Sequence, residues 1–153
     1  MTRKTRYQAA IMSGEEILLI KHQEHKSGRA YWLLPGGGIE DGETEVKCVE
    51  REVREETNLE VKVVGLLLDE PAQHIDHGKY ERFKTYLCQP QTTQASPGYE
   101  PEADAAAIYG IVDVGWCQIN NETNWDELIV NDPITAPILR RIRAALKNRN
   151  SVS

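Results

Sequence analysis

Cysteine, long apolar runs and excess positive charge are all scarce in this chain of 153 residues. Its three cysteines, Cys48, Cys88 and Cys117, are odd in number and scattered, which argues against a disulfide framework and favours reduced thiols in a cytoplasmic protein. No stretch approaches the length of a membrane-spanning helix, and no apolar signal core precedes the first expected strand. A net charge of −6 disfavours broad attraction to a membrane or to long nucleic acid, so we expect neither as a partner.

The length and composition are those of an ordinary globular protein. Hydrophobic residues make up 40% of the chain and charged residues 27%. The sequence contains no internal repeat and no second unit with its own pattern. We therefore expect one domain over residues 1–153, with residues 148–153 as a frayed tail.

The most informative segment is the acidic run within residues 37–59. Glu52, Glu55 and Glu56 are three and one residues apart, which places all three carboxylates on one side of a helix. Like charges so close repel one another unless a positive charge lies between them. A hard divalent cation with oxygen ligands, such as Mg²⁺, is the natural candidate.

The helix that carries this run is predicted from Thr44 to Thr57, where there is no Gly or Pro. Thr44 is a suitable N-cap, and Asn58 is suited to a left-handed C-cap. Val46, Val49 and Val53 recur at helical spacing and predict an apolar stripe that packs on a sheet. The carboxylates are expected at the edge of this stripe.

A glycine-rich loop precedes the helix. The sequence Pro35-Gly36-Gly37-Gly38 lets the backbone approach a ligand closely, and its carbonyl groups can add to a metal shell. A Glu-rich helix by itself is more often a solvated face than a metal site. The loop, together with Glu43 and Arg51 at fixed offsets from it, favours the metal site.

These residues resemble the signature of the Nudix hydrolases, Gly-x5-Glu-x7-Arg-Glu-U-x-Glu-Glu-x-Gly-U, where U is a bulky aliphatic residue. One position departs, since Asn58 stands where the family has Gly, but Asn adopts the same backbone conformation. The lead-in Trp32-Leu-Leu-Pro35-Gly36-Gly37-Gly38 also resembles that of the family. The matching positions are Gly37, Glu43, Arg51, Glu52, Val53, Glu55, Glu56 and Leu59.

The resemblance implies an α/β/α sandwich with a mixed sheet between helices. It also implies a Mg²⁺- or Mn²⁺-dependent hydrolase that cleaves a diphosphate linkage in a nucleotide by attack of water on phosphorus. Glu52, Glu55 and Glu56 would hold the metal, and the carbonyl group of Gly37 would complete its shell. Arg51 would support the loop by a two-pronged contact with a carboxylate, for which Glu43 is the candidate.

The general base is left open by the sequence. The resemblance implies that the general base is Glu52 or Glu56, or that it comes from a loop beyond the motif. Glu100 and Glu102, which follow Pro97, are the first loop candidates, and Asp113 is another. Each of these three is, taken singly, more often a plain surface acid.

The substrate is likewise open. Arg29, Trp32 and Glu100 are weak candidates for substrate contacts, and His74 and His77 form a histidine pair that is typical of a surface. Oxidised and ordinary nucleoside triphosphates and ADP-ribose all fit the motif. Two alternatives are a nucleotide-binding sensor without turnover, which intact carboxylates disfavour, and a hydrolase of RNA caps or 5′-triphosphates. A homodimer is compatible with the family.

The remaining elements follow from periodicity. Alternation predicts a hairpin of strands 6–12 and 16–22, and further strands at 61–68, 79–89 and 107–116. The polar stretch 91–104, with two prolines, predicts a loop. Helical spacing predicts a closing helix over 137–147 and a short helix that begins near residue 125. Strands mixed with two main helices indicate helices on both faces of a mixed sheet.

Overall fold

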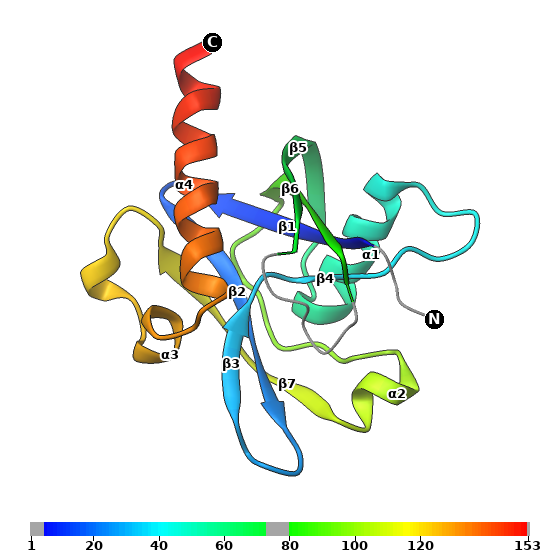
Figure 1. Cartoon of the computed structure of the whole chain (residues 1–153). Helices are drawn as coiled ribbons and strands as arrows, with labels where there is room; N and C mark the ends of the chain where they lie inside the picture. Colours follow the sequence, from blue (N-terminus) through cyan, green and yellow to red (C-terminus); the bar gives the residue numbers. More distant parts are fainter. Residues whose placement is uncertain (1–4, 73–79, 153) are drawn as a thin grey trace.

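The computed structural model describes residues 5–72 and 80–152. Their strands and helices are named in chain order in Figure 1. The strands are β1 (Thr5–Ser13), β2 (Glu16–Glu24), β3 (Ala30–Leu33), β4 (Gly36–Gly37), β5 (Val61–Pro71), β6 (Arg82–Pro90) and β7 (Tyr109–Gln118). The helices are α1 (Glu45–Thr57), α2 (Ala103–Ala106), a 3-10 turn at Glu122–Asn124, α3 (Glu127–Val130) and α4 (Thr135–Val152).

The strands of these residues form one mixed sheet. The order β3-β2-β1-β6-β5 runs across it, while β4 pairs with β1 and β7 pairs with β2. β1 and β6 are parallel, from Thr5 opposite Arg82 to Ile11 opposite Cys88. The other pairs are antiparallel.

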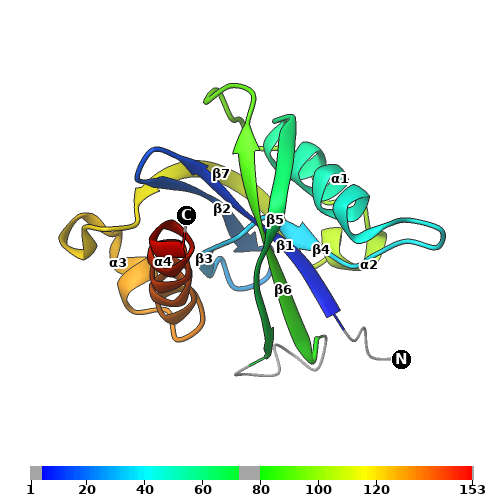
Figure 2. The same cartoon turned by 90° about the horizontal axis from the view of Figure 1, so that it is seen from above.

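The predicted hairpin of β1 and β2 is confirmed at its turn, where Gly14 adopts a φ of +60°. The two strands pair only there, with Met12 opposite Ile17 and Ser13 opposite Glu16. Beyond these pairs they separate, because β1 pairs with β4 and β6 while β2 pairs with β3 and β7. The separation of the two halves of the sheet is visible in Figure 2.

Helices cover both faces of the sheet, so the predicted α/β/α sandwich is confirmed. In Figure 2, α1 lies on one side, and α3 and α4 lie on the other. The core beneath α1 joins Val49 and Val53 to Leu18 and to residues of β1 and β6. The opposite core joins Ile138, Leu139 and Ile142 of α4 to Trp32 and residues of β2. Each helix is therefore fixed by a separate apolar layer.

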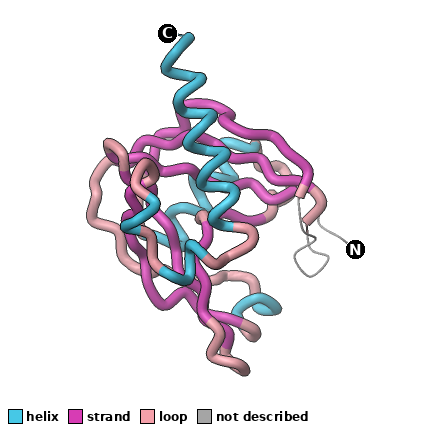
Figure 3. The backbone as a smooth tube through the Cα atoms, turned by 60° about the vertical axis from the view of Figure 1, so that its left-hand side comes forward, coloured by secondary structure: helices cyan, strands magenta, loops and turns pink. Residues whose placement is uncertain are grey.

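Some predicted boundaries were wrong. The closing helix begins at Thr135 and continues to Val152, so residues 148–152, which we expected to be frayed, are helical. They contain no Gly or Pro to stop the helix, and Figure 3 shows its end projecting beyond the sheet. The predicted strand 61–68 extends to Pro71, and the loop 91–104 ends in the short helix α2. In the described residues, no helix is long and apolar enough to span a membrane.

Candidate active site

The acidic helix α1 is fixed at both ends and along one face. The Thr44 side chain accepts a hydrogen bond from the N–H of Lys47 at 3.1 Å, and Asn58 has a φ of 60° as a left-handed C-cap. Val49 and Val53 are fully buried, whereas Val46, which we placed in the same stripe, is 41% exposed. Val46 lies near the helix start, beyond the part that packs on the sheet core.

The packing draws two of the three carboxylates inward. Glu52 retains 4% of its exposure and Glu56 retains 1%, so both lie deeper than the edge position that the sequence indicated. The N–H of Gly36 donates to Oε1 of Glu56 at 2.7 Å. A Cβ atom on Gly37 would lie 2.5 Å from Oε1 of Glu52, so glycine is needed for the loop to approach the helix.

Arg51 fills the space among the carboxylates. Its guanidinium forms a two-pronged contact with Glu43 at 2.7 and 3.0 Å, and Nη2 donates to the carbonyl of Gly38 at 3.1 Å. Nη1 donates to Glu52 at 2.9 Å and to Glu55 at 3.2 Å. The side chain thus joins the glycine-rich loop to the acidic face of α1.

One guanidinium does not neutralise this cluster. Burial raises the pKa of Glu52 to about 7, although Arg51 acts to lower it. Burial, and then the charge of Glu52, raise the pKa of Glu56 well above its usual value. Burial also raises the pKa of Glu55. In contrast, the hydrogen bond from Arg51 lowers the pKa of Glu43. The inner carboxylates therefore lack positive charge.

The donor set suits a hard cation. Among the described residues, no group of three or more His, Cys, Asp or Glu side chains is arranged around a vacant metal position. The guanidinium of Arg51 lies instead between Glu52 and Glu55. Carboxylate oxygens beside backbone carbonyl groups are the ligands that Mg²⁺ and Mn²⁺ prefer.

A loop from another part of the chain closes the C-terminal end of α1. The N–H groups of Gly98 and Tyr99 donate to the carbonyl oxygens of Glu56 and Glu55, each at 2.9 Å. These are carbonyl groups that a helix end leaves without partners inside the helix. We call residues 96–100 the docking loop. Its last residue, Glu100, lies near the cluster, because its charge adds to the effect of burial in raising the pKa of Glu55.

Arg6 is a site residue that the sequence analysis missed. Its Nη2 donates to the carbonyl of Leu34 at 2.8 Å. Burial alone would lower the pKa of Arg6, but the phenols of Tyr80 and Tyr109 and the carboxylates of Glu56 and Glu52 raise it. Nothing in the sequence near Arg6 links it to residues 52–56. The antiparallel pairing of β1 with β4, whose glycines lie against Glu52 and Glu56, brings it there.

A cavity of about 950 Å³ begins at Arg6. Rings from three strands and two loops line it, and two of them are stacked, His22 and Tyr109, with centroids 4.1 Å apart. The other ring side chains of its wall are His25, Tyr31 and Tyr80. The cavity is therefore a broad, ring-lined space next to a buried arginine and an acidic cluster.

Several predicted site residues lie elsewhere. Trp32 belongs to the core beneath α4, on the face of the sheet opposite the carboxylates. Asp113 is the strand partner of Lys21, and the Lys21 side chain lies over the Trp32 ring. Asp113 therefore also lies on the face opposite the carboxylates. Arg29 is exposed and forms an ion pair with Glu24.

Two further predictions concerned Glu102 and a histidine pair. Glu102 precedes α2, and its backbone N–H donates to Oε1 of Glu100 at 3.2 Å. Its charge is not among the main influences on the three helix carboxylates, whereas that of Glu100 is. The histidine pair His74 and His77 lies outside the described residues.

A mixed sheet between helical layers, with buried carboxylates against a glycine-rich loop, defines an α/β/α protein with an acidic cluster beside that loop. The model of the NUDIX domain matches residues 3–132, and the chain belongs to this family. It is 31% identical over 96 residues to the NAD-capped RNA hydrolase NudC of Photobacterium profundum. The match covers 63% of this chain and 34% of that protein, so the chain spans about a third of this relative.

Solved structures show the same fold at low identity. A NUDIX hydrolase from Nitrosomonas europaea superimposes with a TM-score of 0.71 at 19% identity, covering 94% of this chain and 90% of that one. An ADP-ribose pyrophosphatase from Streptococcus suis gives a TM-score of 0.65 at 20% identity, with coverage of 97% and 92%. The expected family and fold are thus confirmed.

Proposed function

We propose that this protein is a divalent-metal-dependent hydrolase that cleaves a diphosphate linkage in a nucleotide derivative. The observation that carries the proposal is a cluster of three helix carboxylates: Glu52 and Glu55 contact the guanidinium of Arg51, and the buried carboxylate of Glu56 lies close enough to Glu52 to feel its charge. A substrate with clustered phosphate charge needs positive charge at this place, because the chain itself carries a net charge of −6.

Mg²⁺ or Mn²⁺ would be held by Glu52, Glu55 and Glu56, with the carbonyl group of Gly37 as a further ligand. A bound cation would neutralise phosphate charge and promote deprotonation of water. Arg51, Glu43 and Gly38 would keep the loop and the helix in register by the contacts described above. Burial of Glu52 and Glu56 excludes bulk water, which strengthens their electrostatic interactions.

The adjoining cavity supports a nucleotide as the substrate. Its size and aromatic wall suit a flat base, and Arg6 at its inner end is placed between the rings and the carboxylates. In this proposal, Arg6 binds the phosphate group of the substrate that lies next to the nucleoside. The similarity to an NAD-capped RNA hydrolase places NAD and NAD-type diphosphates early among the substrates to test.

The test is hydrolysis of a panel of NAD, ADP-ribose, nucleoside triphosphates and oxidised nucleoside triphosphates, with Mg²⁺, with Mn²⁺ and with chelator. We expect one class to be cleaved only with metal, and Glu52→Gln to lower kcat at least about 100-fold. Glu50→Gln is the matched control and retains activity, because Glu50 lies on the same helix but forms an ion pair with Lys47 and not with Arg51.

The outcomes separate the candidate functions. Turnover that is equal with chelator, or equal in Glu52→Gln, would contradict a metal-dependent site at these carboxylates. Tight, metal-dependent nucleotide binding without cleavage of any substrate would instead support the sensor. Cleavage of capped or triphosphorylated RNA in preference to free nucleotides would support the RNA-end hydrolase.

For the general base we favour Glu100 over Glu102 and Asp113. Glu100 is the loop carboxylate whose charge is felt at Glu55 and Glu56, and it also accepts a hydrogen bond from the hydroxyl group of Tyr109 at 3.2 Å. Glu100→Gln is expected to lower kcat at least about 100-fold. Glu102→Gln serves as the control, and an equal loss in both variants would exclude a special role for Glu100.

A further inference from the structure

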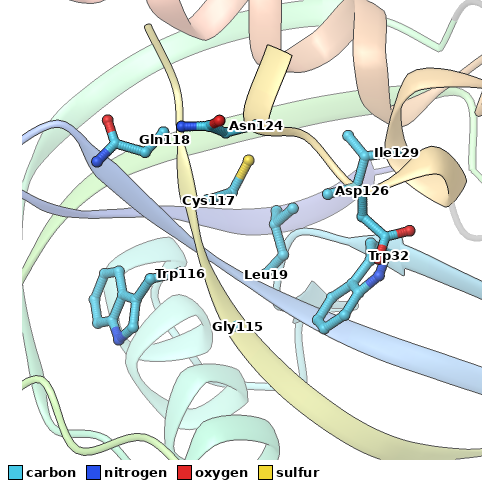
Figure 4. A pocket seen from close by; sticks show the side chains of 9 residues that line it. All are labelled: Leu19, Trp32, Gly115, Trp116, Cys117, Gln118, Asn124, Asp126 and Ile129. Atoms are coloured by element: carbon cyan, nitrogen blue, oxygen red, sulfur yellow. The ribbon is translucent and has the colours of Figure 1, made fainter. Parts of the chain in front are cut away.

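A second cavity, of about 330 Å³, lies on the face of the sheet opposite the carboxylates, between β2, β7 and the start of α3. Figure 4 shows the side chains that line it. Its floor is buried and apolar, made by Leu19, Trp32 and Ile129, while Asn124 and Asp126 form an exposed, polar rim. An apolar floor with a few polar groups at the rim is the usual composition of a small-molecule site.

The floor contains a hydrogen-bond donor that the protein does not use. Trp32 retains 9% of its exposure, and its indole Nε1 is buried without an acceptor among the residues that the structure describes. The other two tryptophans of the chain are satisfied. Nε1 of Trp116 donates to the carbonyl of Thr93 at 3.2 Å, and Nε1 of Trp125 donates to the carbonyl of Gln118 at 2.7 Å. A buried donor without a partner costs free energy, which an acceptor in the cavity would recover.

An acceptor of the protein lies beside this donor. In Figure 4 the nitrogen edge of Trp32 points toward the Asp126 side chain, yet the two form no hydrogen bond. Oδ1 of Asp126 accepts from the N–H of Leu128 at 2.8 Å, and a carboxylate has capacity for further donors. A ligand that meets both groups must present an acceptor next to a donor. The carboxylate at the rim also disfavours anionic ligands, phosphates included.

We propose that this cavity binds a flat, uncharged ring that carries a carbonyl acceptor next to an N–H donor, with the carbonyl on Trp32 and the N–H on Asp126. The ring lies on the apolar floor, between Leu19 and Ile129. Ring amides, as in a pyrimidine or purine base, and ring carboxamides both have this donor–acceptor edge. The site is separate from the proposed catalytic site, since the sheet lies between them.

The test uses the three indole N–H signals of the ¹⁵N-labelled full chain in nuclear magnetic resonance. Uracil represents the ring amides and benzamide the carboxamides, while 1,3-dimethyluracil keeps the carbonyls but lacks the N–H donors. We expect uracil, benzamide or both to shift the Trp32 signal in a saturable way. The Trp125 signal is the internal control and stays in place, because Trp125 does not line the cavity and its N–H already has an acceptor. Dimethyluracil should bind at least about tenfold more weakly.

Two variants complete the design. Trp32→Phe assigns the signal and should weaken binding about tenfold by removing the indole N–H. Asp126→Asn keeps an oxygen that can cap α3, so it should fold normally, and it should weaken binding at least about fivefold. A Trp32 signal that does not move at the highest soluble ligand concentration would overturn the proposal. A shift of the Trp125 signal as large as that of the Trp32 signal, or equal binding of uracil and dimethyluracil, would overturn it too.

Discussion

At the scale of single residues, Arg51 links two segments that the chain separates. Its fork on Glu43 and its bond to the Gly38 carbonyl hold the loop, while Nη1 reaches Glu52 and Glu55 on the helix. A hydrogen bond with Glu43 is the main reason that the pKa of Arg51 is raised, against the lowering effect of burial. Lysine has the same charge but not the planar fork.

We therefore expect Arg51→Lys to lower the free energy of unfolding by about 2 kcal/mol. Urea unfolding of the metal-free protein measures this. Arg54→Lys is the matched control, because Arg54 lies on the same helix but is exposed and forms a surface ion pair with Glu60. It should change stability by less than about 0.5 kcal/mol. Equal losses in the two variants would show that the fork of Arg51 adds nothing to ordinary surface pairing.

At the scale of elements, α1 depends on segments distant in sequence at both of its ends. The docking loop satisfies carbonyl groups at the C-terminal end of α1. At the other end, the first residue of the helix, Glu45, accepts hydrogen bonds from Lys84 and Tyr86 of β6. These contacts position the acidic face, although none of the distant residues belongs to the motif.

The docking loop gives the first prediction about elements. A Cβ atom on Gly98 would overlap the carbonyl oxygen of Glu55, so Gly98→Ala must displace the loop. We expect a loss of at least about 2 kcal/mol in unfolding free energy and a lower kcat, measured by urea unfolding and by hydrolysis. Gly65→Ala is the control, because a Cβ atom there would only touch the end of Arg149 at 3.8 Å. A fully stable and active Gly98→Ala variant would contradict a positioning role for the loop.

The tie of Glu45 to β6 predicts a pH dependence. Burial alone would raise the pKa of Glu45, but hydrogen bonds from Tyr86 and Lys84 outweigh it and lower the pKa. A carboxyl group whose pKa is lower in the folded state adds stability above its unfolded pKa. It loses that stability as the pH falls through the folded value.

Glu45→Gln should therefore cost about 1 kcal/mol near neutral pH, and the cost should disappear in strong acid. Thermal unfolding of both proteins over a pH series measures the difference. Glu50→Gln, on the same helix, controls for the loss of a helix charge. A cost that is constant with pH would mean that Glu45 acts by packing and not by its charge.

At the scale of the whole molecule, the two cores place the cysteines on both sides of the sheet. All three are free thiols and all are buried, as the sequence led us to expect of reduced cysteines. Burial raises the pKa of Cys48 and of Cys88 to about 12, and that of Cys117 to about 11. The thiolate is the reactive form of cysteine. The three thiols are therefore expected to react slowly, because reagents reach them poorly and because few of them are deprotonated.

We expect none of the three thiols to react rapidly with an aromatic disulfide reagent near pH 8 in the native protein. All three should react in concentrated guanidinium chloride, and absorbance of the released thiolate counts them. One fast-reacting thiol in the native state would contradict the burial of that cysteine. A Cys→Ser variant would then identify it.

Much of the fold and part of the site could be predicted from local pattern. The caps of α1, the turn at Gly14 and the spacing of Glu52, Glu55 and Glu56 depend on interactions between residues that are a few positions apart in the sequence. Element ends were less certain: α4 runs five residues beyond its predicted end at Lys147 because nothing there breaks a helix.

The sequence by itself determined that an acidic helix follows a glycine-rich loop, because this requires only spacing and backbone preference. Only the tertiary structure decided which distant groups meet that helix. The antiparallel pairing of β1 with β4 brings Arg6 beside the carboxylates, and the register of β2 and β3 turns Trp32 to the opposite face. Strand order and register arise from packing over the whole chain, so no local pattern encodes them.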